Sequence, residues 1–397
     1  MPPPVQPTRK PPRPPDELTA KVAPVMDRID AFWARVTEGM HVGELWKSFL
    51  TDARSSYRLY SKDVDAERSA DVSKGKHFIG VVGQFFWAIL EKLTPARRVL
   101  LLVAIALILF PGGEATWHGE AGNVSYSLNT HFYGGLLMFL LLILEVGDRV
   151  VMKRDLQIAK EIQTWLLPAT PPSIAGLEIA FSTRPANTVA GDYYDVFPRG
   201  GPASSESKWV FAMADVAGKS IPAALLMATI QASLKTLAAS PSSLEELVAR
   251  MNTYACSNSQ DGRRFTTAFI AEYDPQSRAL TYVNAGHNPP ILRRQSGSLE
   301  RLEAGGIPLG ILENAPYAAG STVLQTGDWL AVFTDGVVEA ENNRGDEYGE
   351  QRMLFVLHTG VHLSPAQLLQ NLTEDLDRFV AGAPQHDDVT CMLVKVS

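Results

Sequence analysis

The 397-residue chain has only two cysteines, Cys256 and Cys391, and neither belongs to a CxxC pair or a Cys/His cluster. A disulfide framework or a structural zinc site is therefore not expected, and a reducing compartment is the default for the main domain. The net charge is −7, so the chain has no overall basic footprint for nucleic acid. GxSxG, P-loop and HExxH motifs are also missing, and the reaction classes that depend on them have no support.

The N-terminal part of the chain carries no readable chemistry. No secretory signal peptide opens it. Residues 1–15, MPPPVQPTRKPPRPP, are a proline-rich basic tail that cannot pack a core, so we expect disorder or polyproline II conformation there. Residues 16–98 form a mixed, mainly helical region.

Two apolar runs, VLLLVAIALILF (99–110) and FYGGLLMFLLLILEV (132–146), flank a polar stretch. Each run is shorter than the roughly 18–20 residues of a spanning helix, so a buried or interfacial helical pair is an alternative. Lys and Arg are missing from 99–148, but they bracket this region at Arg97, Arg98, Arg149, Lys153 and Arg154. This distribution favours a transmembrane hairpin over 99–148, with its loop outside and both ends cytoplasmic.

An amphipathic linker helix is predicted over 149–168, directly after this hairpin. Val151, Ile158, Ile162 and Trp165 recur at spacings of seven, four and three and mark one stripe, and Pro168 ends the pattern. Such a stripe serves as a homodimer seam or packs on its own domain, and the sequence does not choose between them.

Residues 169–397 change to strands with a few helices. Strand patterns cover LEIAFSTRPA, WVFAMADVAG, DWLAVFTDG and DDVTCMLVKV, and TTAFIAEYDPQSRALTYVNAGH has the outline of a hairpin. Helical patterns cover IPAALLMATIQASLKTLAA, SSLEELVARMNTYA and SPAQLLQNLTEDLDRFVAG. Hairpin strands with helices between the groups predict an α+β sandwich of antiparallel sheets covered by helices.

Aspartates recur in this domain where apolar strands meet loops. They are Asp192 and Asp195 in GDYYDV, Asp215 in ADVAG, Asp335 in FTDG, and Asp387 and Asp388 in HDDVT. Mg²⁺ and Mn²⁺ prefer such all-oxygen ligands, whereas Zn²⁺ recruits His or Cys. Carboxylates in one cleft raise one another's pKa, and a bound cation removes that cost. Aspartate is also common at strand ends, so spacing alone does not decide whether these segments converge.

Six segments, taken in order, resemble the metal-dependent protein phosphatases of the type 2C serine/threonine superfamily, in the bacterial branch named for SpoIIE. They are ANTVAGDYYDVF, MADVAGKSIPAALLMA, YVNAGHNPPIL, GIPLGI, FTDGVVEAENNRGDEYGEQR and HDDVTCML, all within 169–397. The resemblance implies a four-layer sandwich of two antiparallel β-sheets flanked by helices. It also implies two Mn²⁺ or Mg²⁺ ions in a cleft at one end.

The family's site residues can be matched to this sequence. Asp192 and Asp215 occupy metal positions, with Asp215 as the bridging ligand and the Val216 carbonyl in the first ion's shell. Asp335 and Asp387 complete the second side, and the four aspartates are the expected catalytic residues. Asp388 is a further metal candidate which, like Asp195, is better suited to a supporting role. The implied reaction is hydrolysis of phosphoserine or phosphothreonine in a regulatory protein, in this branch often an anti-sigma-factor antagonist, by a water that the two ions activate.

The sequence departs from the eukaryotic members at two functions. They place a histidine just after the bridging aspartate, whereas this chain reads DVAGKS, so the proton donor is open between a metal-bound water, Lys219 and no donor. The phosphate-binding arginine has no assured counterpart, although Arg184 lies upstream of GDYYDV. His287 in NAGHNPP is expected to shape its loop rather than act as an acid or a ligand.

The sequence thus predicts a phosphatase of the bacterial inner membrane with its catalytic domain in the cytoplasm, or, as the alternative location, a cytoplasmic protein. Two other functions stay open. One is a catalytically inactive module that binds a phosphoprotein, and the other is a two-metal hydrolase of small phosphate esters.

Overall fold

A computed structural model of the chain describes residues 86–87, 90, 92–110, 114–119, 122–127, 129–201, 207–218, 221–258 and 264–397. The predicted proline-rich tail and most of the predicted helical region 16–98 lie outside these residues. The chain divides into two compact units, Met1–Glu145 and Val146–Ser397.

The described part of the first unit is a helical hairpin. It contains α4 (Pro95–Leu109), the antiparallel pair β1 (Glu114–Gly119) and β2 (Gly122–Ser127), and the first part of α5 (Thr130–Leu166). The helices touch at Gly134, where an added Cβ would lie 2.7 Å from Ile108 Cγ1. The Thr130 hydroxyl donates to the Phe110 carbonyl at 2.9 Å. Glycine therefore permits the close approach of the two apolar runs.

Helix α5 is longer than the sequence pattern indicates. The second apolar run and the linker stripe were expected as separate segments, but one helix continues from Thr130 to Leu166. No proline interrupts the junction, and the charged residues there are exposed without breaking the backbone ladder. The helix ends just before Pro168, as its position predicts. Ile162 and Trp165 of the stripe are 49% and 80% exposed.

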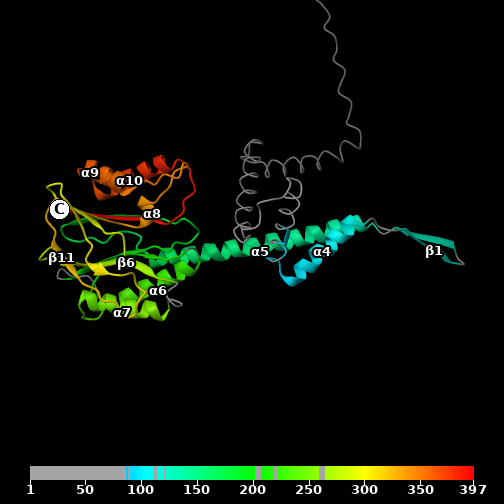
Figure 1. Ribbon diagram of the computed structural model, residues 1–397, viewed down its shortest axis with the longest axis horizontal. Coiled ribbons are helices and arrows are strands. Elements are labelled where there is room, and N and C mark those ends of the chain that lie inside the picture. The colour runs from blue at the N-terminus through cyan, green and yellow to red at the C-terminus, as the bar shows by residue number, and fades with distance from the viewer. Residues whose placement is uncertain are drawn as a thin grey trace, which may run out of the picture. The chain divides into compact units, whose positions relative to one another are not determined.

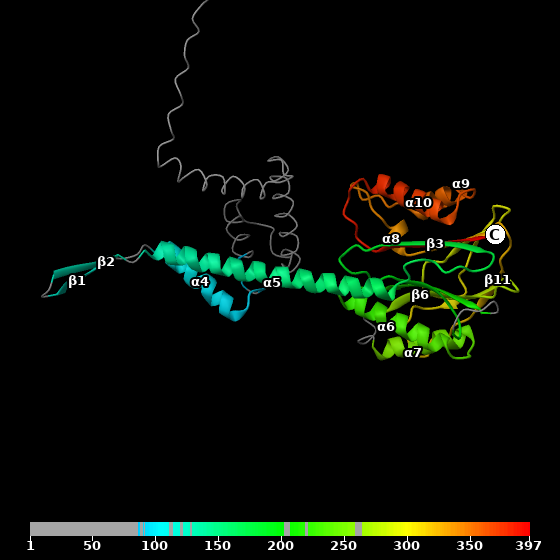
Figure 2. The same cartoon turned by 180° about the vertical axis from the view of Figure 1, so that it is seen from behind.

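The second unit contains two β-sheets (Figures 1 and 2). The first has the order β10-β7-β6-β5-β4, with β11 also on β7, and the second has the order β3-β13-β12-β8-β9. The strands of the first are β4 (Tyr193–Pro198), β5 (Trp209–Val216), β6 (Thr266–Tyr273), β7 (Ala279–Ala285), β10 (Gly305–Gly306) and β11 (Gly320–Val323). Those of the second are β3 (Leu177–Arg184), β8 (Ile291–Arg293), β9 (Leu299–Arg301), β12 (Trp329–Phe333) and β13 (Val389–Val396).

One strand pair departs from the predicted all-antiparallel arrangement. Strand β10 runs parallel to β7, with Gly305 beside Asn284. A Cβ on Gly305 would lie 1.8 Å from the Asn284 carbonyl oxygen. This two-residue contact therefore needs glycine, and it has no apolar alternation by which a strand is recognised.

Helices cover the outer face of each sheet, so the domain has the four layers expected of an α+β sandwich. Helices α6 (Ile221–Ala238) and α7 (Leu244–Ser257) pack on the first sheet. Helices α9 (Glu350–Thr359) and α10 (Pro365–Val380) pack on the second. Figure 1 shows these pairs on opposite sides. The cluster between the sheets includes Met213, Phe269, Leu330, Val332 and Met392, and burial of each such side chain contributes about 1.5–3 kcal/mol.

Helix α6 is the one described helix that is both long and apolar enough to cross a membrane. Its residues Met227, Ile230 and Leu234 are buried in the cluster beneath α6 and α7, as expected of a core helix. The hairpin predicted over 99–148 stays a prediction.

Candidate metal centre

The strand registers bring the ends of four strands toward one site. Tyr193, directly after Asp192, pairs with Ala214, directly before Asp215. In the other sheet Phe333, two residues before Asp335, pairs with Cys391, and Asp387 and Asp388 directly precede β13. Asp335 itself begins the one-turn helix α8 (Asp335–Val338). Antiparallel pairing thus places the end of one strand beside the start of its neighbour in each sheet.

Asp192 links the two sheets. Its side chain is 1% exposed, and Oδ2 accepts hydrogen bonds from the hydroxyls of Thr334 at 3.0 Å and Thr390 at 2.5 Å. Burial raises the pKa of Asp192 well above its usual value, and the charge of Asp215 raises it further. The two hydroxyls act in the opposite direction because they stabilise the carboxylate.

Asp215 lies among other carboxylates. Its pKa is raised to about 7, first by burial and then by the negative charges of Asp335, Asp387 and Asp388. A hydrogen bond with Asp192 partly offsets these effects. Among the described residues, the charges that shift this pKa are those of Asp335, Asp387 and Asp388, so a cation at this point would lower the electrostatic free energy of the group.

Asp388 holds the loop that leads to Asp192. Its side chain is 8% exposed, and its two oxygens accept hydrogen bonds from the backbone amides of Ala186 at 2.7 Å and Gly191 at 2.6 Å. Gly191 also approaches the neighbouring strand, because an added Cβ would lie 3.1 Å from the Val216 carbonyl oxygen. The Val216 carbonyl therefore lies beside the loop that carries Asp192.

Asp387 and Asp335 are brought together by backbone packing. A Cβ on Gly336 would lie 2.0 Å from the Asp388 carbonyl oxygen, so the turn after Asp335 rests directly on the 387–388 backbone. Asp387 Oδ1 accepts the Asp388 amide at 2.9 Å, and its carbonyl accepts Gln385 Nε2 at 2.7 Å. Glycine after Asp335 is thus a steric requirement of the site.

The donor set fits hard divalent cations. It contains carboxylates and a backbone carbonyl, without a histidine or cysteine ligand, and this composition suits Mg²⁺ or Mn²⁺ rather than Zn²⁺. Within the described ranges, no three Asp, Glu, His or Cys side chains form a ready-made shell for one ion. A centre of two ions divides its carboxylates between them, and Mg²⁺ in particular keeps several waters. Mutual repulsion together with an all-oxygen donor set is compatible with such a centre.

Comparison with known proteins identifies the domain. Residues 205–397 match the family model for Stage II sporulation protein E (SpoIIE). The C-terminal part of the chain is therefore similar to the SpoIIE family. The sequence also resembles the phosphoserine phosphatase RsbU of Bacillus subtilis, with 29% identity over 251 residues, which cover 63% of this chain and 72% of RsbU.

Two further relatives define the extent of the likeness. Protein IcfG of Synechocystis is 25% identical over 276 residues, covering 63% of this chain and 42% of IcfG, so the chain spans less than half of that relative. The SiaA-PP2C domain of Pseudomonas aeruginosa superposes with a TM-score of 0.55 at 18% identity, over 63% of this chain and 99% of that domain. This likeness shows that the domain has a PP2C-like fold.

Asp195 lies in a different environment from Asp192 and Asp215. It is buried, accepts hydrogen bonds from the Tyr193 hydroxyl at 3.0 Å and the Val196 amide at 2.8 Å, and forms an ion pair with Lys235 at 2.9 Å. A cation of the protein already compensates its charge.

His287 has the loop-shaping contacts expected from the sequence. Its backbone amide donates to Asn284 Oδ1 at 2.7 Å, and Asn284 Nδ2 donates to its carbonyl at 2.9 Å. The ring is buried, with Nδ1 3.1 Å from the Thr267 hydroxyl oxygen. Burial lowers the pKa of His287 to about 4, so the ring is neutral at neutral pH.

Of the candidate residues for binding phosphate and donating a proton, the structure describes Arg184 but not Lys219. Arg184 ends β3 and forms a 2.5 Å ion pair with Asp377. It also lines a cavity of about 120 Å³, which Asp387 and Glu339 share. Lys219 lies outside the described residues. Sequence reasoning missed the hydroxyls of Thr334 and Thr390, whose signal was their place beside the aspartates in FTDG and DDVT.

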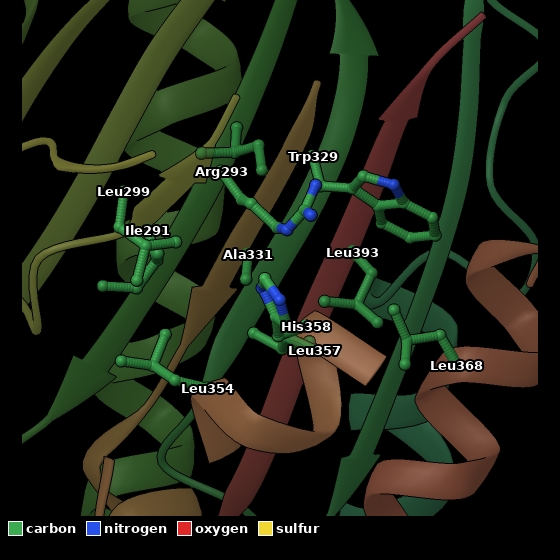
Figure 3. A pocket seen from close by; sticks show the side chains of 11 residues that line it. Ile291, Arg293, Leu299, Trp329, Ala331, Leu354, Leu357, His358, Leu368 and Leu393 are labelled. Atoms are coloured by element: carbon green, nitrogen blue, oxygen red, sulfur yellow. The ribbon is translucent and has the colours of Figure 1, made fainter. Parts of the chain in front are cut away.

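A second cavity lies away from the carboxylates, between the second sheet and α9 and α10 (Figure 3). Its volume is about 30 Å³, room for about one water, and its lining is mainly apolar, with Trp329, Leu357 and Leu393 among the contacts. Arg293 and His358 are its charged or titratable lining residues, and no carboxylate lines it. This hollow therefore belongs to the packing of the helix layer.

Proposed function

We propose that the domain is a protein serine/threonine phosphatase that hydrolyses phosphoserine or phosphothreonine in a regulatory protein with two Mn²⁺ or Mg²⁺ ions. The observation that carries this proposal is the convergence of Asp192, Asp215, Asp335 and Asp387 from four strand ends, where the charges of Asp335 and Asp387 both raise the pKa of Asp215. The match to the SpoIIE family model and the likeness to a phosphoserine phosphatase support the same reaction.

The ions would be held by carboxylates from both sheets. We assign Asp192, Asp215, the Val216 carbonyl, Asp335 and Asp387 as the groups that would hold the two ions. When bound, the ions would offset the carboxylate repulsion, polarise the phosphoryl group and lower the pKa of the attacking water. Asp388 was also a metal candidate, but two backbone amides already occupy its oxygens, so its assigned role is to hold the Asp192 loop.

The remaining residues orient the ligands. Thr334 and Thr390 donate to Asp192 Oδ2 and would hold this carboxylate in place when it binds a cation. His287 is buried and neutral, so it does not serve as an imidazolium donor to the leaving alcohol. We therefore assign the reaction a proton source other than this histidine.

We also propose that α4 and the first part of α5 associate with a membrane, which would place the phosphatase domain on the cytoplasmic side. The support is a set of exposed apolar side chains, including Val99, Leu102, Leu136, Phe139, Leu142 and Ile143. Helix α4 has 15 residues and is about 22 Å long, whereas the hydrocarbon core of a bilayer is about 30 Å thick. Helix α4 alone is therefore too short to span the core. Recovery of the full chain in the soluble fraction would contradict the membrane assignment.

The decisive experiment measures hydrolysis of an aryl phosphate and of a phosphoserine peptide by the full-length chain, with and without Mn²⁺. We expect Mn²⁺-dependent turnover of the peptide that Asp215→Asn and Asp335→Asn abolish. Turnover of aryl phosphate alone would favour a hydrolase of small phosphate esters. A protein that binds the phosphopeptide but neither turns it over nor binds Mn²⁺ would favour the inactive binding module.

A further inference from the structure

One polar residue of the linker helix is buried. Gln163 is 6% exposed, although its neighbours Ile162 and Trp165 on the same helix are largely exposed. Its side-chain amide forms a pair of hydrogen bonds with the backbone of Ala190: Nε2 donates to the carbonyl at 2.7 Å, and Oε1 accepts the amide at 2.9 Å. The amide thus satisfies both polar groups of one residue, as a neighbouring strand would.

Ala190 belongs to the loop that positions the candidate metal ligands. It lies two residues before Asp192, and the next residue, Gly191, donates its backbone amide to Asp388 at 2.6 Å. The loop is therefore fastened on one side by Gln163 of α5 and on the other by Asp388, which precedes β13. A continuous path of hydrogen bonds and peptide bonds joins the linker helix to Asp192.

This contact favours two discrete states rather than gradual adjustment. Hydrogen bonds weaken steeply outside a narrow range of distance and angle, so a helix displacement of about 1–2 Å would break both bonds together. Breaking them would leave the Ala190 amide and carbonyl unpaired in a buried place, at about 1–3 kcal/mol for each group. When α5 moves, the loop at Ala190 therefore either moves with it and keeps both hydrogen bonds, or stays in place and loses both.

We propose that Gln163 is a positioning residue that couples the state of α5 to the placement of Asp192, and thereby sets the affinity of the site for divalent cations. This proposal rests on the proposed function, because it assigns Asp192 to an ion. When Gln163 is engaged, the loop holds Asp192 against Thr334 and Thr390. When α5 moves, the loop loses one of its two attachments and Asp192 loses its fixed orientation.

The test compares Gln163→Leu, which removes both hydrogen bonds, with Gln157→Leu, the same substitution at an exposed glutamine six residues earlier on α5. Mn²⁺ affinity of the full-length protein is measured by calorimetry, and kcat and KM are measured at saturating Mn²⁺. We expect Gln163→Leu to weaken Mn²⁺ binding by about 10–100-fold, with kcat largely recovered at saturation, as for residues that orient metal ligands. Gln157→Leu should match wild type.

Gln163→Glu provides a second variant if the leucine variant does not fold. Its carboxylate still accepts the Ala190 amide but sets an oxygen against the carbonyl in place of a donor, so a loss of Mn²⁺ affinity is again expected. A lower Tm with unchanged Mn²⁺ affinity in the Gln163 variants would overturn the coupling and leave Gln163 a packing residue. Wild-type protein that neither binds Mn²⁺ nor turns over substrate would overturn the proposed function and this inference together.

Discussion

The aspartates of the β4–β5 strand pair fall into two groups, Asp195 alone and Asp192 with Asp215, which differ in what compensates their charge. Asp195 on β4 is paired with the Lys235 ammonium and the Tyr193 hydroxyl. Asp192 and Asp215, at the start of β4 and the end of β5, are paired with hydroxyls and with further carboxylates. A buried charge needs a partner of opposite sign. The first group has one in Lys235, whereas the charges that raise the pKa of the second group are carboxylates. A metal ion would supply positive charge to the second group.

The comparison is tested most severely by neutralising one aspartate from each group. Asp215→Asn should reduce Mn²⁺-dependent phosphatase activity by at least about 10²-fold, the scale on which an active site loses rate when one charge-stabilising group is removed. Asp195→Asn should retain the Mn²⁺ dependence, because its partner is a lysine. Initial rates over a Mn²⁺ series measure both variants. Equal losses at the two positions would remove the distinction between a metal site and a structural ion pair.

The metal-free domain should respond to pH in the direction set by the raised pKa of Asp215. This carboxyl binds its proton up to about pH 7 in the folded chain, whereas the usual value is 3.8. The folded state therefore holds more protons than the unfolded state between these values, and the free energy of unfolding falls as pH rises from about 4 to 7. Urea unfolding in EDTA at pH 5 and pH 7.5 measures this slope.

Asp215→Asn supplies the control for that slope. The amide does not ionise, so the metal-free variant should lose stability less steeply across the same window, and it should exceed wild type in stability at pH 7.5. Addition of Mn²⁺ should reverse the order, because only wild type gains from the ion. A variant as pH-dependent as wild type would show that another group controls the transition.

A smaller effect is expected where the two sheets meet at Asp192. Thr390→Val keeps the shape of the side chain but removes the hydroxyl that lies 2.5 Å from Asp192 Oδ2. Loss of such a contact to a ligand weakens metal binding by about 10–100-fold, and Thr390→Ser should restore most of it. Mn²⁺ titration of the three proteins checks this order. Failure of serine to restore binding would indicate that the methyl group, not the hydroxyl, matters.

Sequence indicated the aspartates of the site because each ends or begins an apolar strand within a recognisable motif. It did not indicate Thr334 or Thr390, since threonine is common in strands and its hydroxyl gains a role only when the sheets come together. Gln163 was hidden for a similar reason, because its partner Ala190 is 27 residues away. Strand β10 was missed because two glycines have no side-chain periodicity. The local sequence pattern thus indicates candidate ligands and core positions. Contacts between elements that are far apart in the sequence become visible only in the folded structure.

The smallest expected change in activity concerns the exposed face of the same linker helix. Ile162 and Trp165 are exposed while Gln163 between them is buried, so one turn of α5 faces both solvent and the loop that leads to Asp192. We propose that the exposed stripe is a homodimer seam. Ile162→Asp should then shift the full-length protein toward monomer in analytical ultracentrifugation, with its Tm and its Mn²⁺ affinity as a monomer close to wild type, as for most surface substitutions. An unchanged oligomeric state would exclude the seam, and a change in Mn²⁺ affinity that follows dimer dissociation would extend the coupling through Gln163 to the partner.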